Sequence, residues 1–493
     1  MSFTQSVSTH SARQDFLEAP LDRAHAESLQ RQLYQRLKEG ILKGQLAAGS
    51  RLPGSRALAE TLSVSRNTVT IAYEHLISEG YVRADRKGST VAALMRPVQR
   101  EAQAENNAPS RVALRLSRIR SSPARSDTST ALRPGVPSLS HFPLAVWRRM
   151  LDRAVREASP AELNYGDPFG QAELRAAIAA HVARTRGVHC EPSQVIVTEG
   201  AQEALMLCVR LLTNPGDTAW VEDPGYRGAK AAMHAGDLRI VPKRMDEEGL
   251  HVGAADWRSR TPRLIYTTPS HQYPTGAVMS VARRLALISD ARKHGTWIIE
   301  DDYDSEFRHS GEPIGAMQGL VADAPVLYVG TFSKTMFASL RLGFLVMPPR
   351  LLVSAQDALR EMLRGGHSHE QLAMAGFIES GQFARHLGRM RRLYRERQHA
   401  LRGALTRHLR VPHIIEGGQG GLHLAVRLPR DFPDARIAEA ARQYGMAPMP
   451  LSSFAMAPAL EDNGLVLGYG NTATELLDPL VKRLSQLVLT AGG

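Results

Sequence analysis

Tyr328-Val329-Gly330-Thr331-Phe332-Ser333-Lys334-Thr335, followed by Ser339-Leu340-Arg341-Leu342-Gly343, is the stretch that best indicates the fold of this chain. The apolar run that begins at Val326 predicts a short buried strand. The strand leads into a turn that presents Thr331, Ser333 and Lys334, with Arg341 seven residues after the lysine. A lysine amine forms a Schiff base with an aldehyde, and hydroxyls and a guanidinium suit a phosphate. The stretch therefore predicts a site for a phosphorylated aldehyde; the alternative is an ordinary surface lysine after a strand.

A second apolar run, Trp297-Ile298-Ile299-Glu300-Asp301-Asp302-Tyr303, ends in acidic residues and a tyrosine. A pyridoxal phosphate site needs a carboxylate against the pyridine nitrogen, because the carboxylate keeps the ring protonated as an electron sink. It also needs a hydroxyl near the ring oxygen. Asp301 and Tyr303 supply both groups at a strand end, where open α/β sheets bind ligands. Together with Lys334 they predict a pyridoxal phosphate site, whereas we expect Asp302 and Asp304 to be acids of a solvated loop.

Short apolar strands alternate with helical stretches through the rest of this region. Such alternation implies an α/β fold with a mostly parallel sheet. The glycine-rich run Gly417-Gly418-Gln419-Gly420-Gly421 precedes another strand, 422–426, and we expect it to open a smaller C-terminal subdomain. The strands expected in the large sheet cover residues 195–198, 218–221, 264–267, 297–303 and 326–329.

These segments resemble the fold type I aminotransferases, and the resemblance extends through the C-terminal two-thirds of the chain. It implies that Gly200-Ala201-Gln202 is a phosphate loop opening a helix, where backbone N–H groups favour an anion. It also implies that Tyr226, in Asp223-Pro224-Gly225-Tyr226, stacks on the pyridine ring, and that Tyr165 reaches the phosphate of a partner subunit. Pro274-Thr275-Gly276 matches the family's turn, but Tyr273 replaces its usual asparagine. The cofactor-binding residues implied are Ala201, Gln202, Tyr226, Asp301, Tyr303, Thr331, Ser333, Lys334, Arg341 and, toward the partner subunit, Tyr165.

Bulk composition narrows the class of protein. The 493 residues suffice for two or three domains, and 43% are hydrophobic, as in soluble globular proteins. A net charge of +12 and a pI of about 9.9 favour a polyanionic partner, although many basic proteins bind no nucleic acid. The two cysteines, Cys190 and Cys208, lie in no metal or redox motif and suggest a reducing compartment. Without a signal-peptide pattern or a long apolar run, the expected location is cytoplasmic.

The N-terminal region carries a different pattern. After a polar arm, Leu29, Leu33, Leu37 and Ile41 recur at helical spacing, and Gly44 ends that helix. Ser55 is expected to cap a short second helix. Helix, short helix, turn, helix and basic hairpin make a winged helix-turn-helix. The expected helices cover residues 29–42, 56–62 and 66–78, and the expected strands cover 81–84 and 90–93.

In a winged helix-turn-helix, the start of the second helix of the pair reads base edges in the major groove. Arg66 suits guanine, Asn67 suits adenine, and hydroxyls suit phosphates. The alternative is a small structural helical domain, which leaves the polar, basic end of this helix without a purpose. The DNA-binding residues predicted are Ser65, Arg66, Asn67, Thr68 and Thr70 on the recognition helix, and Arg51, Ser55, Arg56 and Lys87 as phosphate contacts.

Residues 50–59 and 64–69 closely resemble the GntR family of bacterial repressors, and this resemblance covers roughly residues 27–93. From Leu94 the composition shifts to proline, serine and arginine, which predicts a flexible linker whose arginines are solvated or contact phosphates. We therefore expect four parts: an arm over 1–24, a DNA-binding domain over 25–94, a basic linker over 95–130, and an aminotransferase-like, pyridoxal phosphate-binding domain over 131–493.

A GntR-like reader joined to an aminotransferase-like domain resembles the MocR-type regulators. The resemblance implies a dimeric, pyridoxal phosphate-dependent transcription regulator that binds operator DNA and responds to pyridoxal phosphate itself, an amine or an amino acid. Aminotransferases usually clamp the substrate carboxylate with an arginine near the C-terminus, and Val466 occupies that place here, leaving Arg227 as a weak substitute. Two alternatives stay open: a working aminotransferase that also binds DNA, and a DNA-binding module whose second domain binds no cofactor.

Overall fold

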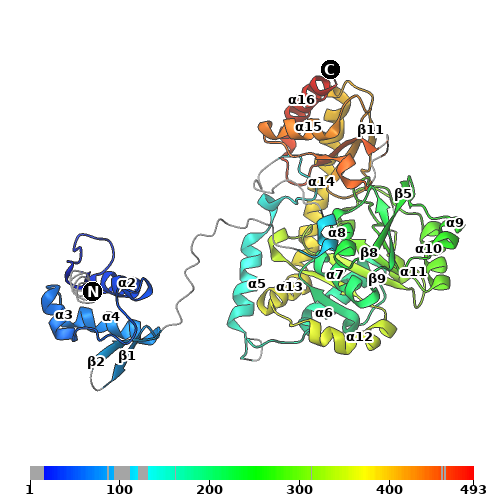
Figure 1. Ribbon diagram of the computed structural model, residues 1–493. Coiled ribbons are helices and arrows are strands. Elements are labelled where there is room, and N and C mark those ends of the chain that lie inside the picture. The colour runs from blue at the N-terminus through cyan, green and yellow to red at the C-terminus, as the bar shows by residue number, and fades with distance from the viewer. Residues whose placement is uncertain are drawn as a thin grey trace. The chain divides into compact units, whose positions relative to one another are not determined.

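The computed structural model describes residues 16–85, 88–93, 112–119, 131–160, 163–311, 314–456, 459 and 462–492. The chain divides into two compact units, Met1–Ser110 and Arg111–Gly493, and each is described by itself (Figure 1). In the described ranges, no helix has both the length and the apolar character needed to cross a membrane.

In the first unit, blue in Figure 1, three helices that lie wholly within the described residues pack against a β-hairpin. Leu33 and Leu37 on the first of these helices, and Val69 and Leu76 on the third, have no exposed surface. Because these pairs are spaced four and seven residues apart, each helix buries one face, as its periodicity predicts. The elements are α2 (Leu29–Leu42), α3 (Ser55–Thr61), α4 (Arg66–Ser78), and the antiparallel strands β1 (Val82–Asp85) and β2 (Gly88–Val91).

The start of α3 differs from the prediction. The helix begins at Ser55 itself, its N-cap residue is Gly54, and no side chain caps it, so the prediction that Ser55 is the cap was wrong. Serine is common both at the N-cap and beside it, so the pattern locates a helix start only to within a residue. Lys87, the predicted phosphate contact in the hairpin, lies outside the described residues.

The second unit is built on an eight-stranded sheet. Strands β9, β8, β7, β4 and β5 are parallel to one another, whereas β10 is antiparallel to both of its neighbours and β6 is antiparallel to β5. The predicted mostly parallel sheet is therefore confirmed. From edge to edge its strands are β3 (Val195–Thr198), β10 (Gly343–Val346), β9 (Val326–Thr331), β8 (Trp297–Asp302), β7 (Leu264–Thr267), β4 (Thr218–Asp223), β5 (Arg239–Asp246) and β6 (Gly249–Leu250).

Helices cover both faces of this sheet, because successive side chains of a strand point to opposite faces. On β8, Ile299 belongs to a core with α7, α8 and α12, whereas Ile298 belongs to a core with α9, α10 and α11. The two layers leave the carboxyl ends of the parallel strands as the edge where a site can form. The helices are α5 (Leu144–Arg156), α6 (Ala172–Arg186), α7 (Ala201–Leu212), α8 (Arg227–Ala235), α9 (Ala254–Ser259), α10 (Val281–His294), α11 (Met317–Leu320), α12 (Pro349–Met362) and α13 (Ser368–Glu379).

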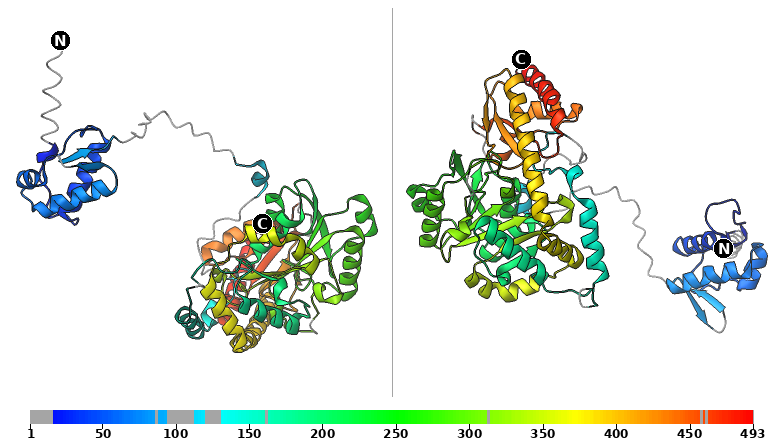
Figure 2. Two further views of the ribbon diagram at one scale, coloured as in Figure 1. Left: turned by 90° about the horizontal axis from the view of Figure 1, so that it is seen from below. Right: turned by 180° about the vertical axis from the view of Figure 1, so that it is seen from behind.

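A smaller C-terminal subdomain follows, as predicted. Its sheet has the order β11-β12-β14-β13, and every neighbouring pair is antiparallel. The long helix α14 runs from the large sheet to this subdomain, as Figure 2 (right) shows in yellow and orange. The elements are α14 (Gln382–His408), β11 (Ile414–Glu416), β12 (His423–Arg427), α15 (Asp434–Ala441), β13 (Met449–Pro450), β14 (Gly464–Gly468) and α16 (Thr474–Ala491).

One short segment of the predicted linker is described and belongs to the second unit. It forms the 3₁₀ helix η1 (Leu114–Arg118), which lies against α8. Nη1 of Arg118 is 3.9 Å from a carboxylate oxygen of Asp237, just beyond the end of α8. Both side chains are exposed, so the ion pair itself contributes little to stability.

Candidate functional site

The start of α4 is exposed and carries the residues that are predicted to read base edges. Ser65 is the N-cap of α4, and its Oγ accepts a hydrogen bond of 3.1 Å from the backbone N–H of Thr68. Arg66 and Asn67 are exposed at the first turn, and Nε of Arg66 donates to Oγ of Ser55 at 3.4 Å. The fold thus brings the predicted base-reading residues together with one predicted phosphate contact, and the cap fixes the direction in which the helix starts.

Asp301 lies at the carboxyl end of β8 and is only 4% exposed. One of its carboxylate oxygens, Oδ2, accepts a hydrogen bond of 2.8 Å from the hydroxyl of Tyr266, and Oδ1 has no hydrogen-bond partner among the described residues. Burial raises the pKa of Asp301 to about 7, and the hydrogen bond from Tyr266 opposes that rise. A buried carboxylate oxygen without a partner is costly, so this atom is placed to meet a cationic N–H.

Lys334 lies beyond the end of β9, in a half-buried position. Its Nζ donates a hydrogen bond of 2.7 Å to the backbone oxygen of Gly135. Gly135 has φ of +75°, and a Cβ built there would lie 3.1 Å from Nζ of Lys334. Glycine is therefore suited to this position both by its backbone conformation and by the space that it leaves for the amine. The sequence analysis missed Gly135 because it is 199 residues from Lys334.

The predicted phosphate-binding residues come from three segments that converge beside this lysine. Helix α7 begins at Ala201, directly after Gly200, whose φ is +83°. Nη2 of Arg341 donates 2.6 Å to the backbone oxygen of Glu199, and the hydroxyl of Thr331 lies 3.1 Å from that of Ser333. A helix N-terminus, two hydroxyls and a guanidinium form an environment that favours a phosphate.

The remaining predicted cofactor residues occupy different surroundings. Gln202 donates 3.0 Å to the backbone oxygen of Gly228, which joins the phosphate loop to the loop of Tyr226. Tyr226 is half-buried, with its ring edge-on to that of Tyr273 at 6.1 Å between centroids. Tyr165, by contrast, is 77% exposed. Arg227 is half-buried as the first residue of α8.

Asp302 and Asp304 were expected in a solvated loop, and this prediction was wrong: they are 5% and 1% exposed. Asp302 accepts hydrogen bonds of 2.7 Å from Nε of Arg186 and from the hydroxyl of Tyr328. Burial by itself would raise the pKa of Asp302, but the Arg186 guanidinium holds it below its ordinary value. Its partner Arg186 is 116 residues away, so no local pattern reveals the pair.

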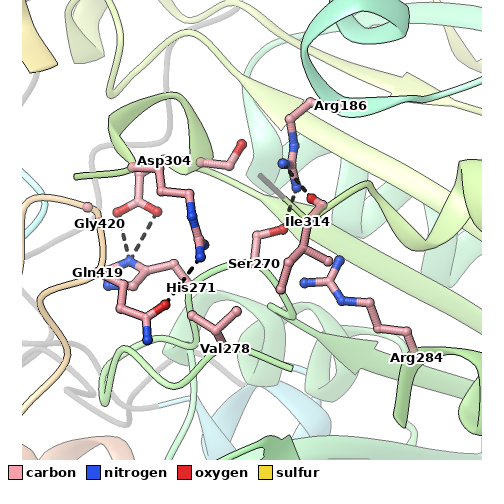
Figure 3. A pocket seen from close by; sticks show the side chains of 12 residues that line it. Arg186, Ser270, His271, Val278, Arg284, Asp304, Ile314, Gln419 and Gly420 are labelled. Carbon is pink, nitrogen blue, oxygen red and sulfur yellow. Dashed lines mark hydrogen bonds and ion pairs between the residues drawn. The ribbon is translucent and has the colours of Figure 1, made fainter. Parts of the chain in front are cut away.

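Asp304 pairs with His271, and the pair lines the small pocket drawn in Figure 3. Both carboxylate oxygens of Asp304 are 3.1 Å from Nδ1 of the histidine. The hydroxyl of Tyr303 lies 3.0 Å from the same nitrogen and donates 2.9 Å to the backbone oxygen of His271. The segment Ser270-His271-Gln272 precedes the Pro274-Thr275-Gly276 turn, and this position in the motif is the signal that could have identified His271.

Val466 lies in the middle of β14 and is fully buried. It packs in an apolar cluster with Leu451 and Phe454, against which Tyr273 and Met449 also pack. The aromatic ring of Tyr273 also contacts that of Phe454 edge-on, at 5.2 Å between centroids. The position where a carboxylate-binding arginine was sought is thus part of an apolar cluster in this chain.

The residues at this strand edge fit pyridoxal phosphate. The unpartnered oxygen of Asp301 suits a ring N–H, Lys334 offers an amine, and the start of α7 suits a phosphate. When bound, the cofactor supplies an aldehyde that reacts with amines and a ring that withdraws electrons. Asp301 would hold the ring nitrogen, the residues at the start of α7 the phosphate, and Lys334 the reactive carbon.

Two family models match the chain. The model for aminotransferase class I and II matches residues 133–464, and the model for bacterial regulatory proteins of the gntR family matches residues 29–91. The two matches agree with the division into two units, and together they cover most of the chain.

Two relatives match this chain over nearly its whole length, and so over both parts. The "Probable rhizopine catabolism regulatory protein MocR" of Rhizobium meliloti is 39% identical over 94% of this chain and 93% of its own length. The "HTH-type pyridoxine biosynthesis transcriptional regulator PdxR" of Corynebacterium glutamicum is 30% identical over 94% of this chain and 96% of its own.

Solved structures resemble the second unit. The α-aminoadipate aminotransferase LysN of Thermus thermophilus, complexed with N-(5'-phosphopyridoxyl)-L-leucine, has a TM-score of 0.70, with 26% identity over 77% of this chain and 97% of its own. The kynurenine aminotransferase of Pyrococcus horikoshii has a TM-score of 0.69, with 24% identity over the same shares of the two chains. This fold makes pyridoxal phosphate the cofactor of the second unit. The chain belongs to the MocR-type subfamily of GntR-family transcription regulators, in which a DNA-binding unit is joined to a pyridoxal phosphate-binding unit of the aminotransferase fold.

Proposed function

We propose that this regulator changes its affinity for operator DNA when the site at Lys334 binds pyridoxal phosphate or an amine that reacts with it. The observation that carries the proposal is the buried, unpartnered oxygen of Asp301 beside a half-buried lysine, in a chain that also carries a DNA reader. A ligand shifts a conformational equilibrium only by its differential affinity for the two states. Binding that supplies a partner to Asp301 gives such a difference.

Each predicted residue has a role in this proposal. Lys334 holds the cofactor covalently, Asp301 binds the ring nitrogen, and Tyr303 lies by the ring oxygen. Tyr226 stacks on the ring. The phosphate is bound by Ala201, Gln202, Thr331, Ser333 and Arg341.

The effector in this proposal is pyridoxal phosphate or an amine that does not depend on a carboxylate clamp at Val466. That residue is fully buried in an apolar cluster, which offers no charge to a carboxylate. The name of one relative refers to the regulation of pyridoxine biosynthesis, which supports an effector related to the cofactor. For an amino acid effector, Arg227 is the remaining candidate to bind the carboxylate.

We further propose that the protein acts as a homodimer in the cytoplasm, where it meets its DNA. Tyr165 is 77% exposed, which suits a residue that completes the phosphate site of a second copy. A dimer also presents two recognition helices, and the spacing of two half-sites on DNA is geometrically strict. A small change in the dimer therefore suffices to alter DNA affinity, with a coupling of roughly 1–3 kcal/mol.

The test is a DNA titration with three forms of the full-length protein: cofactor-free, loaded with pyridoxal phosphate, and loaded with added amines. DNA selected by the protein from a random-sequence pool serves as the operator. We expect DNA affinity to differ at least fivefold between two of the forms. Equal affinity in all three, together with sustained transamination at roughly 1 per second or more, would instead identify an aminotransferase that also binds DNA.

A further inference from the structure

His271 is held between Tyr303 and Asp304, deep in the second unit. His271 is 4% exposed, and Asp304 is 1% exposed. Nδ1 of His271 is 3.1 Å from both oxygens of Asp304 and 3.0 Å from the hydroxyl of Tyr303. In Figure 3 the two dashed lines from Asp304 meet at the histidine ring. Nδ1 of His271 is thus within hydrogen-bond distance of both the Asp304 carboxylate and the Tyr303 hydroxyl.

The hydrogen-bond geometry assigns the protons. Nδ1 of His271 lies within hydrogen-bond distance of the Asp304 carboxylate and of the Tyr303 oxygen, so we assign it a hydrogen that these two acceptors share. The Tyr303 hydroxyl donates 2.9 Å to the backbone oxygen of His271. The other ring nitrogen, Nε2, is buried and has no hydrogen-bond partner among the described residues. The imidazole is therefore oriented by Asp304 and Tyr303, through Nδ1.

Two glycines leave the histidine ring little room to turn. A Cβ built on Gly421 would lie 2.1 Å from Cε1 of His271, and one built on Gly276 would lie 3.1 Å from its Nε2. Both glycines have positive φ, +77° and +79°, so they also satisfy turns that other residues rarely adopt. Ring packing and hydrogen bonds therefore fix the same orientation, as expected of a residue that positions another group.

A cavity of about 20 Å³ lies beside the pair, which is room for about one water molecule. Its lining includes Arg308 as well as His271, Asp304 and Gln419, and the last three are labelled in Figure 3. Arg308 donates to Gln419 at 3.3 Å across this cavity. The carboxylate end of the pair is thus beside a polar cavity, and the ring of Tyr303 lies edge-on to that of Tyr273, at 5.9 Å between centroids.

We propose that His271 and Asp304 are a positioning pair that holds the Tyr303 phenol for the cofactor's ring oxygen, and that the pair thereby sets the pH at which the linkage between Lys334 and the cofactor takes up a proton. This inference rests on the proposed attachment of the cofactor to Lys334. The Nδ1–H that the Tyr303 oxygen shares with Asp304 makes the phenol O–H a stronger donor, and in this proposal the O–H turns from the backbone oxygen of His271 to the ring oxygen when the cofactor binds. A stronger donor to the ring oxygen stabilises that oxygen as an anion, and the linkage then loses its proton at a lower pH.

Other titratable groups around His271 do not replace this pair. His423 lies at 5.0 Å between ring centroids, donates 3.0 Å to the backbone oxygen of Pro274, and has a pKa well below its ordinary value because it is buried. Burial lowers the pKa of His309 to about 4. Both histidines are thus neutral near pH 7. Asp302 and Lys334 also act on Asp304: the Asp302 carboxylate raises the pKa of Asp304 and the Lys334 amine lowers it. Arg186, Arg284 and Arg308 line the cavity.

A metal ion is the competing explanation for this cluster. His271, Asp304 and His423 each offer one ligand atom, and these atoms lie within 4.8 Å of one another. However, Nδ1 of His271 already bonds to Asp304 and Tyr303, and Nε2 of His423 already donates to the backbone oxygen of Pro274. These two nitrogens are therefore engaged in hydrogen bonds and do not point a lone pair at a metal ion. The nearby cations also oppose a divalent ion. We therefore favour the hydrogen-bonded pair and make metal binding an outcome of the test.

The experiment is a pH titration of the absorption spectrum of full-length protein loaded with pyridoxal phosphate. His271→Leu and Asp304→Asn should each move the titration midpoint upward by about 0.5–1 pH unit, a three- to tenfold change in proton affinity. His271→Asn should restore most of the wild-type midpoint, because its side-chain N–H can take the place of Nδ1–H. His309→Asn is the matched control and should not move the midpoint, since His309 bonds Tyr469 and not Tyr303.

A double variant separates positioning from general damage. Tyr303→Phe should give the largest shift, and adding His271→Leu to it should give no further shift, because the pair acts through the phenol. An unchanged midpoint in Asp304→Asn, an additive shift in the double variant, or a wild-type midpoint that moves after dialysis against a chelator would each overturn the inference. A protein that binds no cofactor at Lys334 would refute the proposed function itself, which is a distinguishable result.

Discussion

The start of α4 and the carboxyl end of β8 are both rich in polar residues, yet they are built in opposite ways. Ser65, Arg66 and Asn67 are neighbours in sequence and are exposed to solvent. Asp301 and Asp302 are almost fully buried, and their partners Tyr266 and Arg186 lie on other strands or helices. Exposed charges cost little free energy, whereas a buried charge must find a partner or shift its pKa. The DNA reader is therefore a local motif, and the cofactor site is a property of the whole sheet.

The difference in burial also determines how readily the side chains of each site can move when a ligand binds. Glu222 illustrates the buried kind: its carboxylate accepts hydrogen bonds from the hydroxyls of Thr267 and Thr268 at 2.7 and 2.6 Å. Such a group is fixed in place and responds to a ligand only together with its network. The residues at the start of α4 are free to adapt to a DNA surface. Four variants test this contrast, from the largest expected effect to the smallest.

The strongest test is Lys334→Ala, which should abolish covalent retention of the cofactor completely, because no other group supplies the amine that bonds to it. Borohydride reduction of the loaded wild-type protein followed by peptide mapping should label the peptide containing Lys334. Lys293→Ala, an exposed lysine on α10, is the control and should retain the label. Labelling of another peptide in the wild-type protein would show that the site is misplaced.

The next test concerns the buried charge itself, through Asp301→Asn in cofactor-free protein. Burial raises the pKa of Asp301 to about 7, above its ordinary value of about 4. Between these values the folded protein holds a proton that the unfolded chain has lost, so the free energy of unfolding falls as the pH rises, and the loss is complete above about pH 7. Asparagine cannot ionise, so the variant should be more stable than wild type at about pH 8, by roughly 2–4 kcal/mol, and this advantage should shrink toward pH 5.

Urea unfolding followed by tryptophan fluorescence measures this difference. All four tryptophans, at positions 147, 220, 257 and 297, lie in the second unit, so the signal reports on that unit alone. Asp152→Asn, at an exposed position of α5, is the matched control and should not change the pH dependence. A variant whose stability relative to wild type is the same at every pH would contradict the buried-charge argument.

The third test addresses the exposed site. Arg66→Ala should weaken binding to the selected DNA by roughly 1–3 kcal/mol if Arg66 makes a bidentate base contact, and it should reduce sequence discrimination. The measurement is the ratio of affinities for selected and scrambled DNA at a fixed salt concentration. Arg31→Ala on the exposed surface of α2 should leave the ratio unchanged. If Arg66→Ala also leaves it unchanged, another segment reads the bases.

The smallest effect is expected from Ser65→Ala. The Ser65 hydroxyl caps α4 by accepting from the N–H of Thr68 at 3.1 Å, and loss of such a cap costs about 1 kcal/mol. Hydrogen exchange of the backbone amides of α4 in the full-length protein checks this, because it reports on that helix alone. Ser65→Asp should keep the stability, because aspartate also caps helices. Its negative charge should nevertheless weaken DNA binding, which would separate the cap from the phosphate contact.

The sequence was sufficient for the elements and for the residues that belong to continuous motifs. The apolar periodicity of Leu33 and Leu37 predicted α2, and the run ending at Asp301 predicted β8 and a residue for the ring nitrogen. The family of the chain and its cofactor were also predicted correctly. The individual contacts of Arg66 with DNA and of Lys334 with the cofactor stay predictions.

The sequence was not sufficient where a side chain depends on a distant partner. His271 and Asp304 are 33 residues apart, and Gly421, which packs on the histidine ring, lies in the C-terminal subdomain, far along the chain from both. An aspartate with a buried partner has the same local sequence as one in a solvated loop, so Asp304 was misjudged. Gly135 was missed for the same reason, since its backbone contact with Lys334 exists only after folding.

The contact between η1 and α8 connects the described segment of the linker to the helix that follows Tyr226. Helix α8 begins immediately after Tyr226, and Arg118 of η1 reaches Asp237 just beyond its other end. The helix has nine residues and a length of about 13 Å. It therefore spans the distance between the Tyr226 loop and the residues next to η1. Within the second unit, α8 therefore links the Tyr226 loop at one end to the described segment of the linker at the other.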